Sequence, residues 1–279
     1  MKYELSHARI DPSHCLAPGL FRSLMKGERK KRKLDIVYQF NSSQRIEFSG
    51  PEPLDDLDLR VLQGLVAMAG LSGGLLDIHH PKTPTGKELS AALEPTGAGL
   101  FEDALAIEGS FYKLAKEIGY KNPGSTRTIK DMRDSIERLW KVSIIVRDGS
   151  ATRGFRLLAD NLSSESKGFY VALNPMIAQA ALGAGRRYSK ISMAEIRALK
   201  TAPARLIHFR LCGFIDPKKE HPTLISVDTL CGYVWPDPTS GRALNKRREK
   251  AKLGLLELSD LGWSINEISK NKFKIARPI

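Results

Sequence analysis

Residues 110–158, SFYKLAKEIGYKNPGSTRTIKDMRDSIERLWKVSIIVRDGSATRGFRLL, carry the pattern that decides the fold. Ser110 precedes a short helical pattern that ends at Gly119, and Ser125 precedes a longer one that ends near Trp140. Serine is a favoured N-cap, because its side-chain oxygen accepts a hydrogen bond from a free N–H of the first helical turn. Strands follow over residues 143–146 and 155–158, joined by a turn over 147–154. The predicted order is helix, turn, helix and β-hairpin.

Residues 226–276, SVDTLCGYVWPDPTSGRALNKRREKAKLGLLELSDLGWSINEISKNKFKIA, repeat this order. Ser226 and Ser240 precede the two helical patterns, and strands are predicted over 263–268 and 273–276. Helical hairpins are common, so coincidence is the alternative, but the matching β-hairpins favour a duplication. The order is that of a winged helix, whose second helix can enter the major groove of DNA.

We therefore predict an α+β fold with two tandem winged-helix domains, residues 1–183 and 184–279, divided at the small residues Gly183–Gly185. Residues 70–109, rich in Gly and Pro, predict no definite element. The other patterns predict strands over residues 34–40, 45–49 and 169–173 and helices over 57–68, 175–183, 193–199 and 205–214.

The net charge of the 279 residues is +13, from 44 Lys and Arg against 31 Asp and Glu. This charge is uneven, because residues 35–109 hold 4 basic and 12 acidic residues, whereas residues 240–279 hold 10 basic and 4 acidic. A basic surplus draws a protein to polyanions through counterion release, so double-stranded DNA is the expected partner. A basic but inert surface is the alternative. The acidic block argues against a chain that coats DNA along its whole length.

Three widely spaced cysteines form no CxxC pair, so we expect neither a disulfide framework nor a zinc site. The sequence shows no apolar run of about 20 residues that would span a membrane, and no signal-peptide pattern. A cytoplasmic location without membrane contact is expected.

The helix predicted after Ser240 presents a polar face opposite Leu244 and Ala251. Arginine and lysine can contact guanine, asparagine adenine, and glutamate cytosine, so this face is predicted to read bases. Neighbouring basic side chains, including those of the second hairpin, are predicted to contact phosphates. A solvated helix surface is the alternative. The predicted DNA-binding residues of this domain are Ser240, Arg242, Asn245, Lys246, Arg247, Arg248, Glu249, Lys250, Lys270, Lys272 and Lys274.

The helix predicted after Ser125 has a mixed outward face that includes Asp131 and Asp134. This domain is therefore expected to contact the DNA backbone rather than to read bases, through Ser125, Arg127, Lys130, Arg147 and Arg153. Residues 26–33, KGERKKRK, hold six basic residues and one acidic residue. They are either a DNA-contacting arm or a basic loop before a strand.

Missing motifs argue against an enzyme. Gly86–Lys87 lacks the preceding glycine of a phosphate-binding loop, so a helicase or partitioning ATPase is disfavoured. A nickase needs two metal-binding histidines on one face, and His79–His80 are adjacent. The acids at residues 55, 56 and 58 complement a helix dipole more readily than they form a metal site. No catalytic residue, metal or cofactor is expected.

Nine strings resemble the RepC replication initiators of IncQ-type plasmids, in order along nearly the whole chain. They are LSHARIDPSHCLAPGLFR (5–22), RIEFSGPEPL (45–54), LRVLQGLVAMAG (59–70), LAKEIG (114–119), IERLWKVSII (136–145), GFRLL (154–158), YVALNPMIAQA (170–180), RLCGFIDP (210–217) and DTLCGYVWP (228–236).

The resemblance implies an initiator that binds repeated sequences, called iterons, at a plasmid origin. It also implies a tandem winged-helix fold and a plasmid-encoded helicase and primase that supply the enzymatic steps. Opening of adjacent AT-rich DNA and recruitment of the helicase follow as expectations, and self-association is kept as a possibility. A winged-helix transcriptional regulator without origin-melting activity is the alternative.

Overall fold

The computed structural model describes residues 3–72, 74–76, 104–164, 168–183, 188–217 and 221–279. Within these residues the chain mixes helices with four small antiparallel sheets, so the predicted α+β class is confirmed. The predicted boundary between residues 183 and 184 adjoins a stretch outside the described residues. His79–His80 and Gly86–Lys87 also lie outside them.

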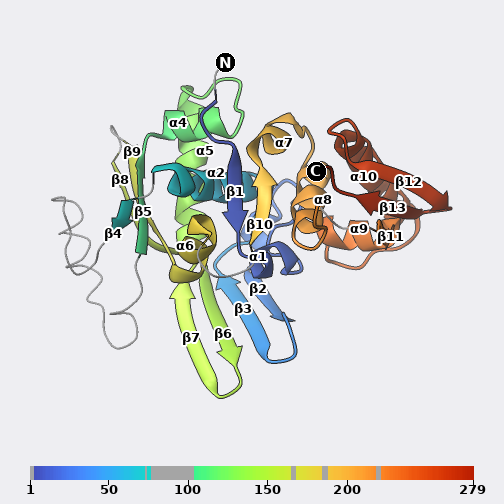
Figure 1. Ribbon diagram of the computed structural model, residues 1–279, viewed down its shortest axis with the longest axis horizontal. Coiled ribbons are helices and arrows are strands. Elements are labelled where there is room, and N and C mark those ends of the chain that lie inside the picture. Colours follow the sequence, from blue (N-terminus) through green and yellow to red (C-terminus); the bar gives the residue numbers. More distant parts are fainter. Residues whose placement is uncertain (1–2, 73, 77–103, 165–167, 184–187, 218–220) are drawn as a thin grey trace.

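The first repeated stretch, which we call the first unit, has the predicted element order (Figure 1). The side chains of Ser110 and Ser125 cap its two helices by accepting hydrogen bonds from the N–H groups of Lys113 and Thr128. The elements are α4 (Phe111–Glu117), α5 (Thr126–Trp140), β6 (Ser143–Asp148) and β7 (Ala151–Arg156).

The second repeated stretch has the same order, and together with the strand before its first helix we call it the second unit. Ser226 caps its first helix through the N–H of Thr229, whereas Ser240 precedes the long helix without a capping hydrogen bond from its side chain. The elements are β11 (Thr223–Ser226), α9 (Val227–Val234), α10 (Gly241–Ser259), β12 (Ser264–Ser269) and β13 (Lys272–Ala276).

The two units place their hairpins in different sheets. In the second unit β13 pairs with both β12 and β11, so the strand before the helices closes one three-stranded sheet. In the first unit β6 pairs with the separate hairpin of β2 (Leu34–Gln39) and β3 (Gln44–Gly50), in the order β2-β3-β6-β7. Figure 1 shows the β2–β3 hairpin and the β6–β7 hairpin extending side by side from the body of the molecule.

The remaining strands join distant parts of the chain. β4 (Gly74–Leu76), β5 (Ala104–Gly109), β8 (Leu158–Ser164) and β9 (Gly168–Leu173) form a sheet of order β4-β5-β9-β8. At the centre β1 (His7–Ile10) pairs with β10 (Ser189–Ser192), so strand pairing crosses the predicted domain boundary.

The core surrounds α2 (Asp56–Ser72), which contacts α4, α5, α6 and β1 (Figure 1). Leu59, Leu62 and Leu65 of α2 are fully buried, and residues 58–69 are buried on every side of the helix, as expected for a helix at the centre of a core. The remaining helices are α1 (Pro12–Leu16), the 3-10 helix η1 (Arg29–Lys31), α6 (Pro175–Leu182), α7 (Met193–Ala198) and α8 (Ala202–Cys212).

One local prediction needs correction. The predicted turn over 147–154 is wrong, because β6 and β7 continue to a tight turn at Gly149–Ser150 and place Arg147 and Arg153 on strands. Glycine is unfavourable inside a helix, yet α10 continues through Gly254. A Cβ at Gly254 would lie 3.1 Å from the backbone nitrogen of Ala204, so the glycine allows α10 to cross close to α8.

Candidate nucleic-acid interface

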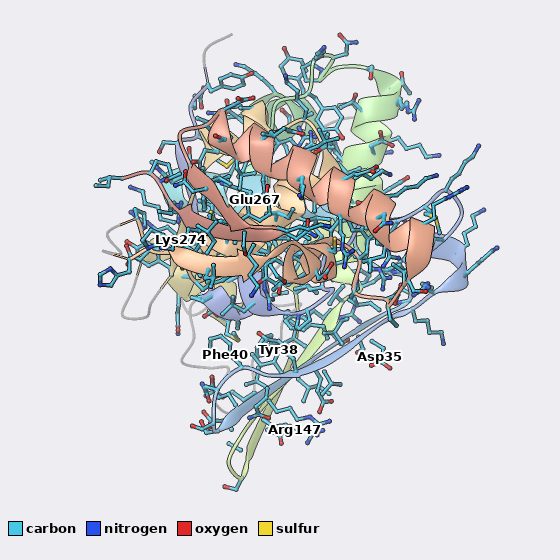
Figure 2. All side chains as sticks on the ribbon, turned by 90° about the vertical axis from the view of Figure 1, so that its right-hand side faces the viewer. Asp35, Tyr38, Phe40, Arg147, Glu267 and Lys274 are labelled. Atoms are coloured by element: carbon cyan, nitrogen blue, oxygen red, sulfur yellow. The ribbon has the colours of Figure 1, made fainter. Side chains whose placement is uncertain are left out.

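The N-terminal half of α10 presents a polar face to solvent, as the sequence predicts. Arg242, Asn245, Lys246, Glu249 and Lys250 are all exposed. The opposite side of α10 faces the protein, and its residues Ala251, Leu255 and Leu258 are buried. Figure 2 shows α10 crossing the front of the molecule, with side chains extending outward along it. A helix exposed on one side is the form that a major groove can admit.

Arg247 and Arg248 differ from these five, because both contact the protein itself. Arg248 donates from Nε and Nη2 to the two carboxylate oxygens of Asp228 on α9, at 2.6 and 2.8 Å. This hydrogen bonding lowers the pKa of Asp228. Arg247 donates to the carbonyl oxygen of Asp237 at 2.6 Å, and its guanidinium lies 5.7 Å from the ring centroid of Trp235. Arg248 therefore connects α10 to α9, and Arg247 connects it to the turn that precedes it.

The lysines of the second hairpin point in different directions. Lys270 lies in the turn, followed by Asn271 with a left-handed φ of 64°, whose N–H donates to Glu267. Lys272 and Lys274 alternate along β13 with the buried Phe273 and Ile275, so they extend from the outer face of the sheet. All three lysines are exposed. Figure 2 shows Lys274 and Glu267 on the side of the molecule where α10 lies in front.

The first unit has a more enclosed long helix. Ser125, Arg127 and Lys130 are exposed at the start of α5. Farther along, Ser135 donates to Asp58 of α2 at 2.7 Å, and Arg138 donates to the same carboxylate at 2.8–3.0 Å. Asp58 is fully buried. The accessible basic part of α5 is thus limited to its first turns.

The two predicted arginines of the first hairpin lie on opposite faces of their sheet. Arg147 pairs in register with Thr152 and Arg153 with Val146, so Arg147 and Arg153 are one residue out of phase. The Nε of Arg147 donates to Glu47 on β3 at 3.0 Å. Figure 2 shows Arg147 at the lower end of the molecule, away from Glu267 and Lys274. These residues do not form one surface with the polar face of α10.

The acidic residues before and within α2 have structural partners. The carboxylate of Asp58 accepts hydrogen bonds from Arg138 at 2.8 Å and from Arg29 at 3.1 Å. Asp56 accepts from Arg205 on α8 at 2.8 Å, and Asp55 also pairs with Arg29. Among the residues that the structure describes, no group of three His, Cys, Asp or Glu side chains is arranged to hold a metal ion.

Sequence reasoning missed the acidic partners Asp228, Asp237 and Glu47. Each of them contacts an arginine that was predicted only as a DNA ligand. Glu47 and Arg147 are separated by 100 residues, so no local pattern reports their contact. Asp228 and Arg248 lie on the two helices of one predicted helical hairpin. Of the three contacts, this one alone could have been inferred from the sequence, because the two helices of a hairpin pack together.

Comparison with known proteins gives one family and one fold. The family model described as Replication protein C (RepC) matches residues 2–279. Two crystal structures of domains 2 and 3 of RctB match with TM-scores of 0.61 and 0.59, at 10% and 12% sequence identity. They cover 97% and 95% of this chain, and 99% and 97% of the RctB chains. A search of the curated proteins finds no match.

Among the described residues, no helix is both long and apolar enough to cross a bilayer.

Proposed function

Because the chain belongs to the Replication protein C (RepC) family, we propose that it is a plasmid replication initiator that binds iteron repeats at the origin through its second unit. The family match confirms the resemblance found in the sequence and supports a role as a replication initiator. The likeness to domains 2 and 3 of RctB adds a shared fold.

The polar face of α10 is the observation that supports this proposal most. It combines Arg242, Asn245, Lys246 and Glu249, whose side chains match the hydrogen-bonding groups of three different bases. We propose that the second unit is a winged helix with α10 as its recognition helix, and the order of β11, α9, α10, β12 and β13 supports this assignment. We propose the winged-helix assignment for the first unit also, with a backbone-contacting role.

The mechanism that we propose is binding without catalysis. The second unit reads the repeat in the major groove while the first unit contacts adjacent phosphates. Several bound copies then deform a nearby AT-rich segment, and the opened strands admit a plasmid-encoded helicase and primase. Bending costs on the order of 1–6 kcal/mol for each site, which additional phosphate contacts can offset.

A gel-shift titration with the repeats of the encoding plasmid tests the binding. We expect the repeats to bind more tightly than a scrambled duplex of equal length. If about 6–10 phosphates are contacted, the affinity falls by roughly 10³–10⁵ between 50 and 200 mM salt. Equal binding to both duplexes, or a flat response to salt, would contradict the proposal.

Strand opening separates an initiator from a winged-helix transcriptional regulator. Permanganate footprinting on a supercoiled origin should reveal unpaired thymines only when an initiator is bound. Protection of the repeats without reactive thymines would favour the regulator. A nicking enzyme would instead convert the supercoiled plasmid to open circles in the presence of a divalent metal, and we expect no such conversion.

A further inference from the structure

Residues 26–33, which we call the basic arm, lie against the second unit, where Arg32 contacts Asp237, a residue 205 positions away in sequence. The backbone N–H of Ser23, just before the arm, donates to the carbonyl oxygen of Val234 at the end of α9. In Figure 2 the N-terminal segment, in blue, lies beside one end of α10. The arm is thus next to the turn that leads into the proposed recognition helix.

Asp237 holds the arm at this position. Its carboxylate accepts hydrogen bonds from Arg32 at 2.8 Å and from Arg22. Partial burial raises the pKa of Asp237, but the hydrogen bonds from these arginines lower it further, so the net pKa is below its usual value. Glu28 organises the arm from within, because it accepts from the N–H of Met25 at 2.9 Å and pairs with Arg32 at 3.1 Å.

Asp237 also connects the arm to α10. It lies between α9 and α10, and its carbonyl oxygen accepts the hydrogen bond from Arg247 described above. One residue therefore contacts the arm through its side chain and the proposed recognition helix through its backbone.

The arginines and lysines of the arm have different partners. Arg29 donates to Asp58 at 3.1 Å and to the carbonyl oxygen of Pro53 at 2.8 Å, and Arg32 contacts Asp237. The planar guanidinium suits such fixed, multiple hydrogen bonds, whereas lysine is a mobile, hydrated point charge. The four lysines are exposed, and no partner among the described residues accounts for their charge: Lys26, Lys30, Lys31 and Lys33.

We propose that the basic arm binds the DNA backbone beside the site that α10 reads, with Asp237 as the residue that positions it. The proposal rests on the proposed function of the second unit. Four uncompensated positive charges beside a DNA-reading helix fit phosphates, which are spaced along the flank of any bound duplex. The arm adds affinity without sequence preference, since phosphates carry no sequence information.

The first test removes the charge of the arm by changing Lys26, Lys30, Lys31 and Lys33 to Gln. Each lost phosphate contact should reduce the slope of log K against log salt by about 0.9. We expect a total reduction of about 2–4, with equal loss of affinity for repeat and scrambled DNA. The matched control changes Lys190 and Lys200, two exposed lysines outside the interface, to Gln. If the control reduces the slope by the same amount for each lysine, net charge explains the effect and the proposal is wrong.

The second test is Asp237→Asn. A pure charge effect and a positioning role of Asp237 predict opposite changes in DNA affinity for this variant. Removal of an acid from a DNA-binding face strengthens binding if only charge matters. If Asp237 positions the arm, binding weakens and the salt slope falls although the protein becomes more positive. Asp260→Asn, at the far end of α10, is the charge-matched control and should not weaken binding. Stronger binding by Asp237→Asn would overturn the positioning role, provided that circular dichroism shows the variant folded.

These experiments distinguish the arm from the function on which it rests. Normal salt dependence of the four-lysine variant, with loss of repeat binding by Asn245→Ala, would exclude the arm and retain the proposed function. Absence of repeat binding by the wild-type protein would exclude both.

Discussion

The long helices of the two units, α5 and α10, occupy equivalent positions but are anchored in different ways. An arginine on each helix donates to an aspartate on a neighbouring helix: Arg138 to Asp58, and Arg248 to Asp228. Asp58 is fully buried and also accepts from Ser135 and Arg29. The side chain of Asp228 is 55% exposed.

This difference separates a structural helix from an accessible one. The buried cluster ties α5 to the central helix α2, and it uses the polar residues in the second half of α5 for folding. The exposed pair holds α10 from one side only and leaves its outer face to solvent. Related element orders thus give a helix used as a scaffold in one place and, in the other, an exposed helix for which we propose a binding role.

The largest effect is expected from Asp58→Asn. Removal of one partner from a buried ion pair leaves the remaining charge without compensation and typically costs about 3–5 kcal/mol. Arg138 and Arg29 would both lose their buried carboxylate. Urea denaturation should show this loss as a lower midpoint with an unchanged slope.

Asp228→Asn is the matched change in the second unit. Its ion pair is exposed, and exposed pairs contribute little to stability. We therefore expect a denaturation midpoint close to that of the wild type. Similar losses in the two variants would contradict the contrast drawn between the anchors.

The sequence predicted the local elements well and the long-range contacts poorly. Ser110, Ser125 and Ser226 cap the helices that follow them, because capping depends on residues within one turn. The pairing of β6 with β3 joins residues about 100 positions apart, and it was not predicted. Polar residues such as Arg147 and Thr152 suggested a turn, yet they form exposed strand positions once this sheet is assembled.

The candidate site follows the same division. The exposed face of α10 was predictable from helical periodicity, because it requires only one helix. The roles of Arg247, Arg248 and the basic arm depend on Asp237 and Asp228, which the tertiary structure brings into contact with them.

His208 of α8, Glu195 of α7 and Trp263 of the second unit form a titratable cluster. Its contribution to stability can be measured from the pH dependence of unfolding. His208 Nε2 lies 2.8 Å from Glu195, whose other oxygen accepts from Trp263 Nε1 at 3.1 Å. Burial alone lowers the pKa of His208, but Cys212 and Glu195 raise it to about 9, above its ordinary 6.5. The stabilisation is thus complete below about pH 6.5 and is lost as the pH rises through about 9.

We expect stability to fall by up to about 3 kcal/mol between pH 6 and pH 10 from this group. Urea midpoints measured across the range should show the loss, and His208→Gln should remove that part of the pH dependence. If the variant retains the full pH dependence, the pair of His208 with Glu195 does not contribute as proposed.

The proposed division between reading and backbone contact predicts different patterns of lost affinity. Arg242→Ala and Asn245→Ala should each cost about 1–3 kcal/mol on the repeat and little on scrambled DNA. Arg127→Ala and Lys130→Ala should weaken both duplexes equally and reduce the salt slope by about 1 each. Fluorescence anisotropy at several salt concentrations measures both quantities. Sequence-dependent loss in the first unit would reverse the assigned roles.

The smallest effect concerns the direction of lysines within one hairpin. Lys270 lies in the turn between β12 and β13, whereas Lys274 extends from the outer face of the sheet, between Leu224 and Asn266 on the neighbouring strands. We expect a duplex held by α10 to meet the hairpin turn before that outer face, because α10 lies over the opposite face of β13, where Lys252 contacts the ring of Phe273. Lys270→Gln should therefore reduce the salt slope by about 1, and Lys274→Gln, with the same change in charge, should reduce it less. Equal reductions would mean that the duplex extends over the outer face of the sheet, and that the second unit contacts DNA on a wider surface than α10 and the hairpin turn.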